Sequence, residues 1–197
     1  MKKLFIPASL IFLFNACHPG NSENTAPGAG RKDTAKKNYL PVADYILSEI
    51  SAVDSFPLRL MKYHTSGRKT DSGIITTPVF DQLAREFLMT ELDSSYFENN
   101  FEENSFVDRS TNLVSFTYST KDTGNGLKRV DVLLSPGEGV DRLNSIYMES
   151  ISSGKDSTLI RKLSWKAGKS FRILHILKVD GGPESTNQTM VVWDSRE

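Results

Sequence analysis

Between Leu113 and Trp193 the chain alternates apolar and polar residues, and this period of two restricts the fold more than any other feature. Around Val114, Phe116 and Tyr118 the intervening residues are serine and threonine, and the pattern returns in later segments. Short stretches rich in glycine, serine and aspartate separate these segments. Alternation indicates half-buried strands, and short turns join antiparallel neighbours. We therefore expect an antiparallel meander of five to seven strands, in a sheet that can be curved or half closed.

Two segments ahead of this region repeat apolar residues at helical spacing. The first runs from Val42 to Val53, and the second runs from Val79 to Leu88. Thr77-Pro78 precedes the second segment, which is a common way for a helix to begin. We expect helices over about 41–53 and 77–92. The predicted fold class is α+β, with two N-terminal helices followed by the sheet and packed on one of its faces.

The first 16 residues have the pattern of a secretory signal peptide. Lys2 and Lys3 precede an apolar run from Leu4 to Phe14, and small residues follow it. A transmembrane helix needs about 20 apolar residues, which is longer than this run. We therefore expect residues 1–16 to be a signal peptide rather than a membrane span.

The stretch Phe14-Asn15-Ala16-Cys17 resembles the lipobox of bacterial lipoproteins, where the signal peptide is cut before a cysteine that becomes lipid-modified. The resemblance covers residues 1–17 alone. It implies that Cys17 is the mature N-terminus, that it carries a diacylglycerol thioether and an acyl chain such as palmitate, and that it anchors the chain in a membrane. By the sorting rule of enteric bacteria, His18 after the cysteine implies the outer membrane of the cell envelope. Whether the domain faces the periplasm or the cell surface stays open.

Cys17 is the only cysteine, so an acylated chain would have no disulfide, cysteine metal site or cysteine nucleophile. From His18 to Asn38 there is no large apolar residue. Such a segment cannot bury enough surface to offset the entropy of ordering it. We expect residues 17–38 to be a lipid-anchored flexible tether in front of one domain over residues 39–197.

One basic, aromatic hairpin is the candidate binding patch. Its residues are Lys162, Trp165, Lys166, Lys169 and Arg172. Such a hairpin could bind a partner, a glycan or a phosphate, or it could point its apolar residues inward and its charges into water. The "AGKS" at 167–170 lacks the upstream glycine of a phosphate-binding P-loop. We instead expect a hairpin turn with Gly168 at positive φ.

Other chemistry is poorly represented in the sequence. The three histidines lack metal-ligand spacing, so we expect no metal or other cofactor, and we expect His175 to be a core residue. No motif identifies a catalytic residue, although a dispersed serine, histidine and aspartate triad stays open. The 24 basic and 24 acidic residues balance, and no basic cluster points to nucleic acid.

These observations favour a lipid-anchored cell-envelope protein of unknown activity, whose domain is a non-enzymatic module that binds an envelope protein or a ligand. One alternative is a carrier of a small apolar ligand inside a curved sheet, and another is a hydrolase-like enzyme with a dispersed site. A large apolar pocket would favour the carrier. A cleft with convergent polar groups and shifted pKa values would favour the enzyme. An exposed aromatic patch on a flat or convex sheet would favour partner binding.

Overall fold

The computed structural model describes residues 39–124, 126–137 and 141–194, all within one compact unit, Lys36–Glu197. The predicted signal peptide, the lipid-attachment residue Cys17 and the predicted tether lie outside the described residues. In the described part of the chain, no helix is long and apolar enough to span a membrane.

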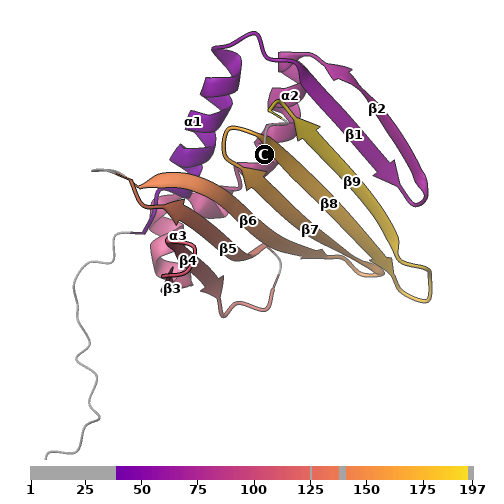
Figure 1. Ribbon diagram of the computed structural model, residues 1–197. Coiled ribbons are helices and arrows are strands. Elements are labelled where there is room, and N and C mark those ends of the chain that lie inside the picture. Colours follow the sequence, from indigo (N-terminus) through magenta and orange to yellow (C-terminus); the bar gives the residue numbers. More distant parts are fainter. Residues whose placement is uncertain (1–38, 125, 138–140, 195–197) are drawn as a thin grey trace, which may run out of the picture. The chain divides into compact units, whose positions relative to one another are not determined.

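The described residues form nine strands and three α-helices (Figure 1). In chain order they are α1 Val42–Asp54, β1 Leu60–Ser66, β2 Lys69–Ile75, α2 Thr77–Ala84, α3 Ser94–Asn100, β3 Phe101–Asp108, β4 Leu113–Thr120, β5 Gly126–Ser135, β6 Arg142–Ser153, β7 Ser157–Lys166, β8 Ser170–Val179 and β9 Ser185–Val192. Two short 3₁₀ turns, Arg85–Phe87 and Thr90–Leu92, connect α2 to α3.

All nine strands belong to one antiparallel sheet in the order β2-β1-β9-β8-β7-β6-β5-β4-β3. The predicted antiparallel meander is confirmed from β3 to β9, where consecutive strands pair. The predicted count of five to seven strands is wrong, because β1 and β2 join the sheet beside β9. The sheet is open, and Figure 1 shows its two edge strands, β2 and β3, at opposite ends.

The expectation of two N-terminal helices followed by the sheet is also wrong. The first predicted helix is present as α1. The second predicted helix is shorter than expected, because α2 ends at Ala84, and α3 is a third helix that was not predicted. A hairpin, β1–β2, lies between α1 and α2 in the chain. Gly67 at φ 57° closes its two-residue turn. Six of the seven residues of β2 are exposed, so the strand has no apolar alternation that the sequence could show.

The buried core lies between the helices and one face of the sheet, which we call the inner face. Phe87 packs edge-on against Trp165, with ring centroids 5.0 Å apart, and Phe80 contacts Phe171 and Trp193. Trp165 is 1 % exposed and Phe87 is fully buried. Phe116 is only partly buried and packs against this core.

The β7–β8 turn is attached to α1 by one carboxylate. Glu49 Oε2 accepts hydrogen bonds from the Trp165 indole nitrogen at 3.2 Å and from the Gly168 backbone N–H at 2.6 Å. Gly168 has φ 67°, as predicted for a hairpin turn, and strands flank it on both sides. The "AGKS" stretch therefore forms a hairpin turn that is hydrogen-bonded to Glu49 of α1.

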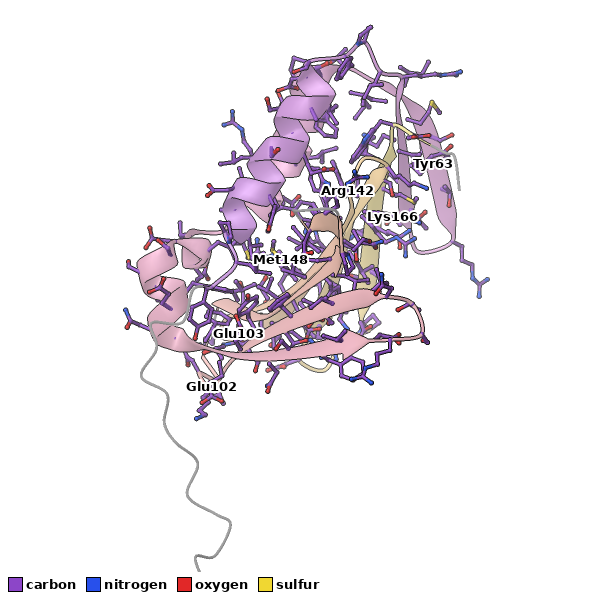
Figure 2. All side chains as sticks on the ribbon, turned by 60° about the vertical axis from the view of Figure 1, so that its left-hand side comes forward. Tyr63, Glu102, Glu103, Arg142, Met148 and Lys166 are labelled. Carbon is purple, nitrogen blue, oxygen red and sulfur yellow. The ribbon has the colours of Figure 1, made fainter. Side chains whose placement is uncertain are left out.

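All three helices contribute their buried residues to this one core, together with inward residues of the strands. Figures 1 and 2 show the helices on the same side of the sheet. The opposite face, which we call the outer face, is not covered by any helix among the described residues. A functional site on the sheet is therefore best sought on the outer face.

Candidate functional site

Side chains of the outer face form rows across the strands, because the register aligns residues from distant parts of the sequence. One row runs from β4 to β1 and consists of Thr117, Asp131, Tyr147, Ser164, Arg172, Met190 and Tyr63. Neighbouring strands lie about 4.8 Å apart, so successive members of the row are close neighbours. We call this set the central row.

The outer face is hollowed over β6, β7 and β8. The hollow has a volume of about 400 Å³. The hollow is lined by outward-facing side chains of four strands: Ser145, Tyr147, Ser164, Lys166, Ser170, Arg172 and Met190. Asn144 and the inward-facing residues Ile146, Trp165 and Phe171 complete the lining. Four hydroxyl groups and two cations therefore lie around the hollow, whereas apolar atoms make up most of its exposed lining.

Among the described residues, Lys166 and Arg172 are the only charged ones that line the hollow. Both are exposed, and neither side chain makes a hydrogen bond or ion pair with another described residue. No carboxylate from the described part of the chain lines this hollow. The charges that line it are therefore positive, and an anion is the complementary ligand.

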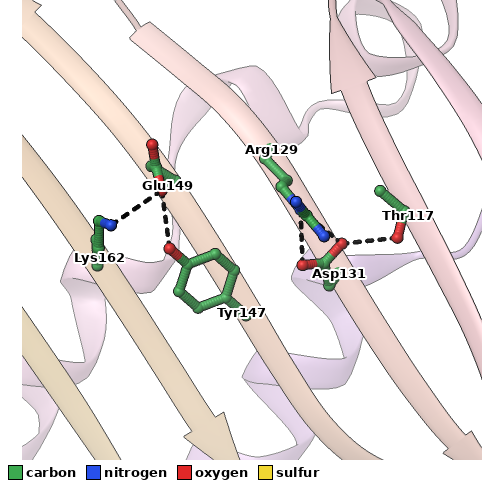
Figure 3. Close-up of polar contacts among 6 residues, drawn as sticks. All are labelled: Thr117, Arg129, Asp131, Tyr147, Glu149 and Lys162. Atoms are coloured by element: carbon green, nitrogen blue, oxygen red, sulfur yellow. Dashed lines mark hydrogen bonds and ion pairs between the residues drawn. The ribbon is translucent and has the colours of Figure 1, made fainter.

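Two other cations of the outer face, Arg129 and Lys162, are paired, as Figure 3 shows. Arg129 Nε lies 2.8 Å from Asp131 Oδ2, and Lys162 Nζ lies 3.6 Å from Glu149 Oε2. Thr117 also donates a hydrogen bond to Asp131, at 2.8 Å. The contrast between these neutralised cations and the two in the hollow marks the hollow as the distinctive part of this face.

Tyr147 forms one wall of the hollow and is held by its neighbour. Its hydroxyl donates a hydrogen bond to Glu149 Oε2 at 2.8 Å (Figure 3). Burial, and then the adjacent Glu149 carboxylate, raise the pKa of Tyr147 to about 12. The hydroxyl is consequently neutral at physiological pH, and its ring is fixed beside the hollow.

The structure separates the five residues of the predicted binding patch. Lys166 and Arg172 line the hollow, whereas Lys162 lies on the outer face but is paired with Glu149. Trp165 points into the core. Lys169 lies in the β7–β8 turn, where its carbonyl accepts hydrogen bonds from the backbone nitrogens of Trp193 and Asp194.

Sequence reasoning missed Tyr147, Ser164 and Met190 as candidate site residues. They lie on three different strands, and only the pairing register brings them beside Arg172. The outward position of Tyr147 and Ser164 could be read from the alternation, since each lies between inward apolar residues, whereas Met190 follows the polar Thr189. Which outward residues become neighbours could not be read in this way.

A groove of about 490 Å³ between α1 and α2 is a second candidate site. It is lined by Leu47, Ile50, Asp54, Asp81, Arg85 and Leu88. Asp81 Oδ1 is buried and receives no hydrogen bond from a donor group among the described residues. Burial, and next the charge of Asp54, raise the pKa of Asp81, while Arg85 opposes this effect. The two carboxyl groups form a hydrogen-bonded pair when one of them is protonated.

A third hollow, of about 280 Å³, lies at the C-terminal end of α1. It is lined by Ala52, Val53, Phe56, Leu58, Gly168, Trp193 and Asp194. Phe56 is 65 % exposed and is the most exposed of these large apolar residues. This hollow is apolar and open to solvent.

The two histidines of the described chain do not form a metal site. His64 Nδ1 lies 3.1 Å from Thr189 Oγ1, whereas His175 Nε2 lies 2.9 Å from Glu86 Oε2. The expectation that His175 is a core residue needs correction: it is only partly buried, because it lies beyond the aromatic core and meets the Glu86 carboxylate. Within the described ranges, no three histidine, cysteine or acidic residues come together to hold a metal ion.

Comparison of this chain with known protein families, curated proteins and solved structures finds no match to any of the three.

Proposed function

We propose that the protein is a lipid-anchored component of the bacterial cell envelope whose domain is a non-enzymatic binding module. Cys17 carries the lipid, and the outer membrane is the membrane to which it attaches the chain. Support for the anchor comes from the apolar leader and the lipobox-like stretch that ends at Cys17. The domain then binds its ligand or partner on the outer face of the sheet.

The hollow over β6–β8 carries this proposal. Core packing accounts for the inner face, where helices and strands bury their aromatic residues together. It does not account for Lys166 and Arg172, which lie in a concave site on the opposite face with no carboxylate beside them. A concave site with a few polar groups and unbalanced charge is the usual form of a ligand site.

The chemistry of the hollow favours binding over catalysis. Within the described ranges, no histidine, cysteine or carboxylate lines it. Tyr147 is the one hydroxyl there with a shifted pKa, and the shift to about 12 prevents it from acting as a general base near neutral pH. The hollow therefore has groups that hold a ligand and lacks the usual groups that transfer protons or attack a substrate.

Site-specific crosslinking in cells tests this function. A photoreactive amino acid in place of Ser164 lies in the hollow, and the same residue in place of Ser48 lies on the exposed side of α1. We expect a discrete crosslinked species from position 164 and none from position 48. Equal crosslinking from the two positions, or none from position 164, would contradict binding on the outer face.

The apolar hollow beside Phe56 and Trp193 favours a second candidate function, the carrier of an apolar ligand. Its volume of about 280 Å³ would hold only part of an acyl chain. A brominated fatty acid should then quench Trp193 fluorescence in a Trp165→Phe chain. Phe56→Asp should remove this quenching, and an absence of quenching in the parent chain would exclude the carrier.

The enzyme alternative has its best support in Asp54 and Asp81, since carboxyl pairs with a raised pKa occur in catalytic sites. The other groove residues are Leu47, Ile50, Leu88 and Arg85. Among the described residues that line this groove, Arg85 is the only side chain that could donate a hydrogen bond to a polar substrate, and Gln82 lies with Asp81 and Arg85 in an adjoining hollow. We therefore interpret the carboxyl pair as a contact between helices rather than as a catalytic centre.

A further inference from the structure

We propose that the hollow over β6–β8 binds an acidic saccharide, with Arg172 and Lys166 holding its anionic group. This inference rests on the proposed binding function of the outer face and adds the chemical class of the ligand. Three properties of the site lead to it: the position of the two cations, the hydroxyl groups around them, and the tyrosines along the central row.

The two cations are placed to share one anionic group. Lys166 on β7 pairs with Ser170 on β8, and Arg172 lies two residues further along β8 on the same face. Such diagonal neighbours in an antiparallel pair lie about 7–8 Å apart. A carboxylate or phosphate between them can accept from both side chains, and the planar guanidinium can bind it through two parallel hydrogen bonds.

Hydroxyl groups surround this cationic pair. Ser145 and Ser170 lie directly opposite Lys166 on the two neighbouring strands, and Ser164 lies opposite Arg172. A serine hydroxyl both donates and accepts, so a ring of serines fits a ligand that itself carries many hydroxyl groups.

Tyrosines lie on either side of Arg172 in the central row. Tyr147 is two strands away on β6 and Tyr63 is two strands away on β1, with Met190 between Arg172 and Tyr63. Four strand spacings separate the tyrosines, which is about 19 Å. Tyr63 is 40 % exposed, and Figure 2 labels it on β1, beyond Lys166 toward the edge of the sheet at β2. Tyrosine rings offer apolar faces with a polar end, which suits the faces of sugar rings along an extended chain.

The charges of the outer face argue against a flat anionic membrane as the ligand. Polybasic membrane sites use about four to eight lysine or arginine residues, whereas the hollow has two. Asp131 and Glu149 lie on the same face, and each is already paired with a cation. A broad negative surface would meet these carboxylates as well, while a compact anion in the hollow would not.

Binding of trigalacturonate to the purified full-length chain tests the inference. The matched neutral probe is its methyl ester, which has the same sugar backbone without the charges. In nitrogen-15 NMR spectra we expect trigalacturonate to shift the amide signals of β6, β7 and β8, and we expect the ester to bind at least tenfold more weakly. Arg172→Ala and Lys166→Ala should each raise the dissociation constant at least tenfold, and Arg172→Lys should recover part of the loss.

Lys178→Ala is the control variant, because Lys178 lies on the same strand but is paired with Glu184, away from the hollow. It should bind trigalacturonate like the parent chain, and unchanged melting temperatures would show that all variants fold. Equal binding of the ester would overturn the anionic part of the proposal. Inorganic phosphate bound as tightly as trigalacturonate would overturn the saccharide, and binding only to phosphatidylglycerol vesicles would assign the hollow to a lipid surface.

The two proposals can fail separately. If trigalacturonate does not bind but position 164 still crosslinks in cells, the acidic saccharide is wrong and the binding function of the outer face stands. If neither result is obtained, both proposals are wrong.

Discussion

Glu49 on α1 accepts a hydrogen bond from the indole nitrogen of Trp165 on β7, 116 residues away in the chain. The same carboxylate oxygen accepts from the backbone N–H of Gly168. One side chain thus satisfies the only polar group of a buried tryptophan and fixes the turn that follows it. Because Trp165 also packs against Phe80 and Phe87, Glu49 connects the first helix to the centre of the aromatic core.

Replacing Glu49 with alanine should destabilise the domain. The substitution leaves the Trp165 indole N–H without an acceptor inside the protein, and an unsatisfied buried donor costs about 1–3 kcal/mol. Glu49→Gln keeps an acceptor oxygen and should retain most of the stability. Urea unfolding of the two variants and the parent measures the difference. Equal losses in both variants would mean that the carboxylate acts through its charge and not through these hydrogen bonds.

Phe87→Ala should be among the most destabilising single substitutions. Phe87 is fully buried against Trp165 and Phe171, and truncation of a buried phenylalanine costs about 3–5 kcal/mol. Phe106→Ala is the matched control, since Phe106 is 67 % exposed on the edge strand β3. Thermal unfolding should show a large drop in melting temperature for the first and little change for the second. Similar melting temperatures for the two variants would show that the 3₁₀ turn that contains Phe87 does not pack on the sheet.

Gly126→Ala should also destabilise the domain, for a different reason. Gly126 has φ 110°, and an added Cβ would lie 2.8 Å from Glu91 Oε1. That oxygen accepts a hydrogen bond from the Leu127 backbone N–H at 3.2 Å, so the clash would disturb the contact between the 3₁₀ turn Thr90–Leu92 and β5. Backbone strain of this kind costs about 1–3 kcal/mol.

Gly73→Ala provides the control for Gly126, because no atom lies within 4 Å of its added Cβ and its φ is not positive. Chemical denaturation should leave this variant close to the parent. A loss at Gly73 as large as that at Gly126 would contradict the steric explanation.

The Asp54 and Asp81 pair predicts a specific pH dependence. The pKa of Asp81 is raised in the folded protein, so the folded state binds more protons than the unfolded state at intermediate pH. The favourable contribution of protonated Asp81 is therefore present below the unfolded pKa of about 3.9 and is lost as pH rises through the folded pKa. Asp81→Asn, which cannot ionise, should be increasingly more stable than the parent as pH rises through this window.

The difference in unfolding free energy between Asp81→Asn and the parent, measured from pH 3 to pH 8, checks this sign. A difference curve is needed because Asp93 and Asp108 have lowered pKa values through hydrogen bonds from nearby serine and backbone groups. Their contribution has the opposite sign and is lost as pH falls. A difference that shrinks as pH rises would refute the carboxyl pair.

Cys17→Ser should abolish lipid attachment if the lipobox resemblance holds. Cells fed a clickable palmitate analogue should label the parent chain, and the variant should be unlabelled and leave the membrane fraction. One acyl chain binds a membrane only reversibly, so stable association of the parent also requires more than one chain on the cysteine. Equal labelling of parent and variant would remove the anchor from the proposed function.

Sequence reasoning was reliable where a residue pattern reports burial directly. The alternation around Phe116 and Tyr118 predicted antiparallel strands, and the apolar spacing from Val42 to Val53 predicted α1. It failed where burial leaves no pattern. Strand β2 is almost wholly exposed, and α3 is a seven-residue helix with one buried residue, Phe97.

The site was partly predictable for the same reason. Lys166 and Arg172 lie close together in the sequence, on the two strands of one hairpin, and both belong to the five-residue patch that the sequence indicated. Tyr147 joins them through the register between β6 and β7, and Tyr63 joins through β1 and β9. That register depends on long-range pairing and on irregularities such as the shift between Leu133 and Leu134, which a single sequence does not reveal.

The pairing of β1 with β9 has a consequence for the time at which the domain can complete its fold. Met61 lies opposite Val192, so the first strand to be synthesised gains its second neighbour only when the last strand has emerged. Until then β1 has only β2 beside it, and an isolated two-stranded hairpin is at best marginally stable. Contacts between such distant residues form slowly, because a long loop must close first. A chain interrupted before β9 would therefore keep unpaired strand edges on β1 and on β8. Addition of β9 covers both edges and so protects the nascent domain from pairing with other chains.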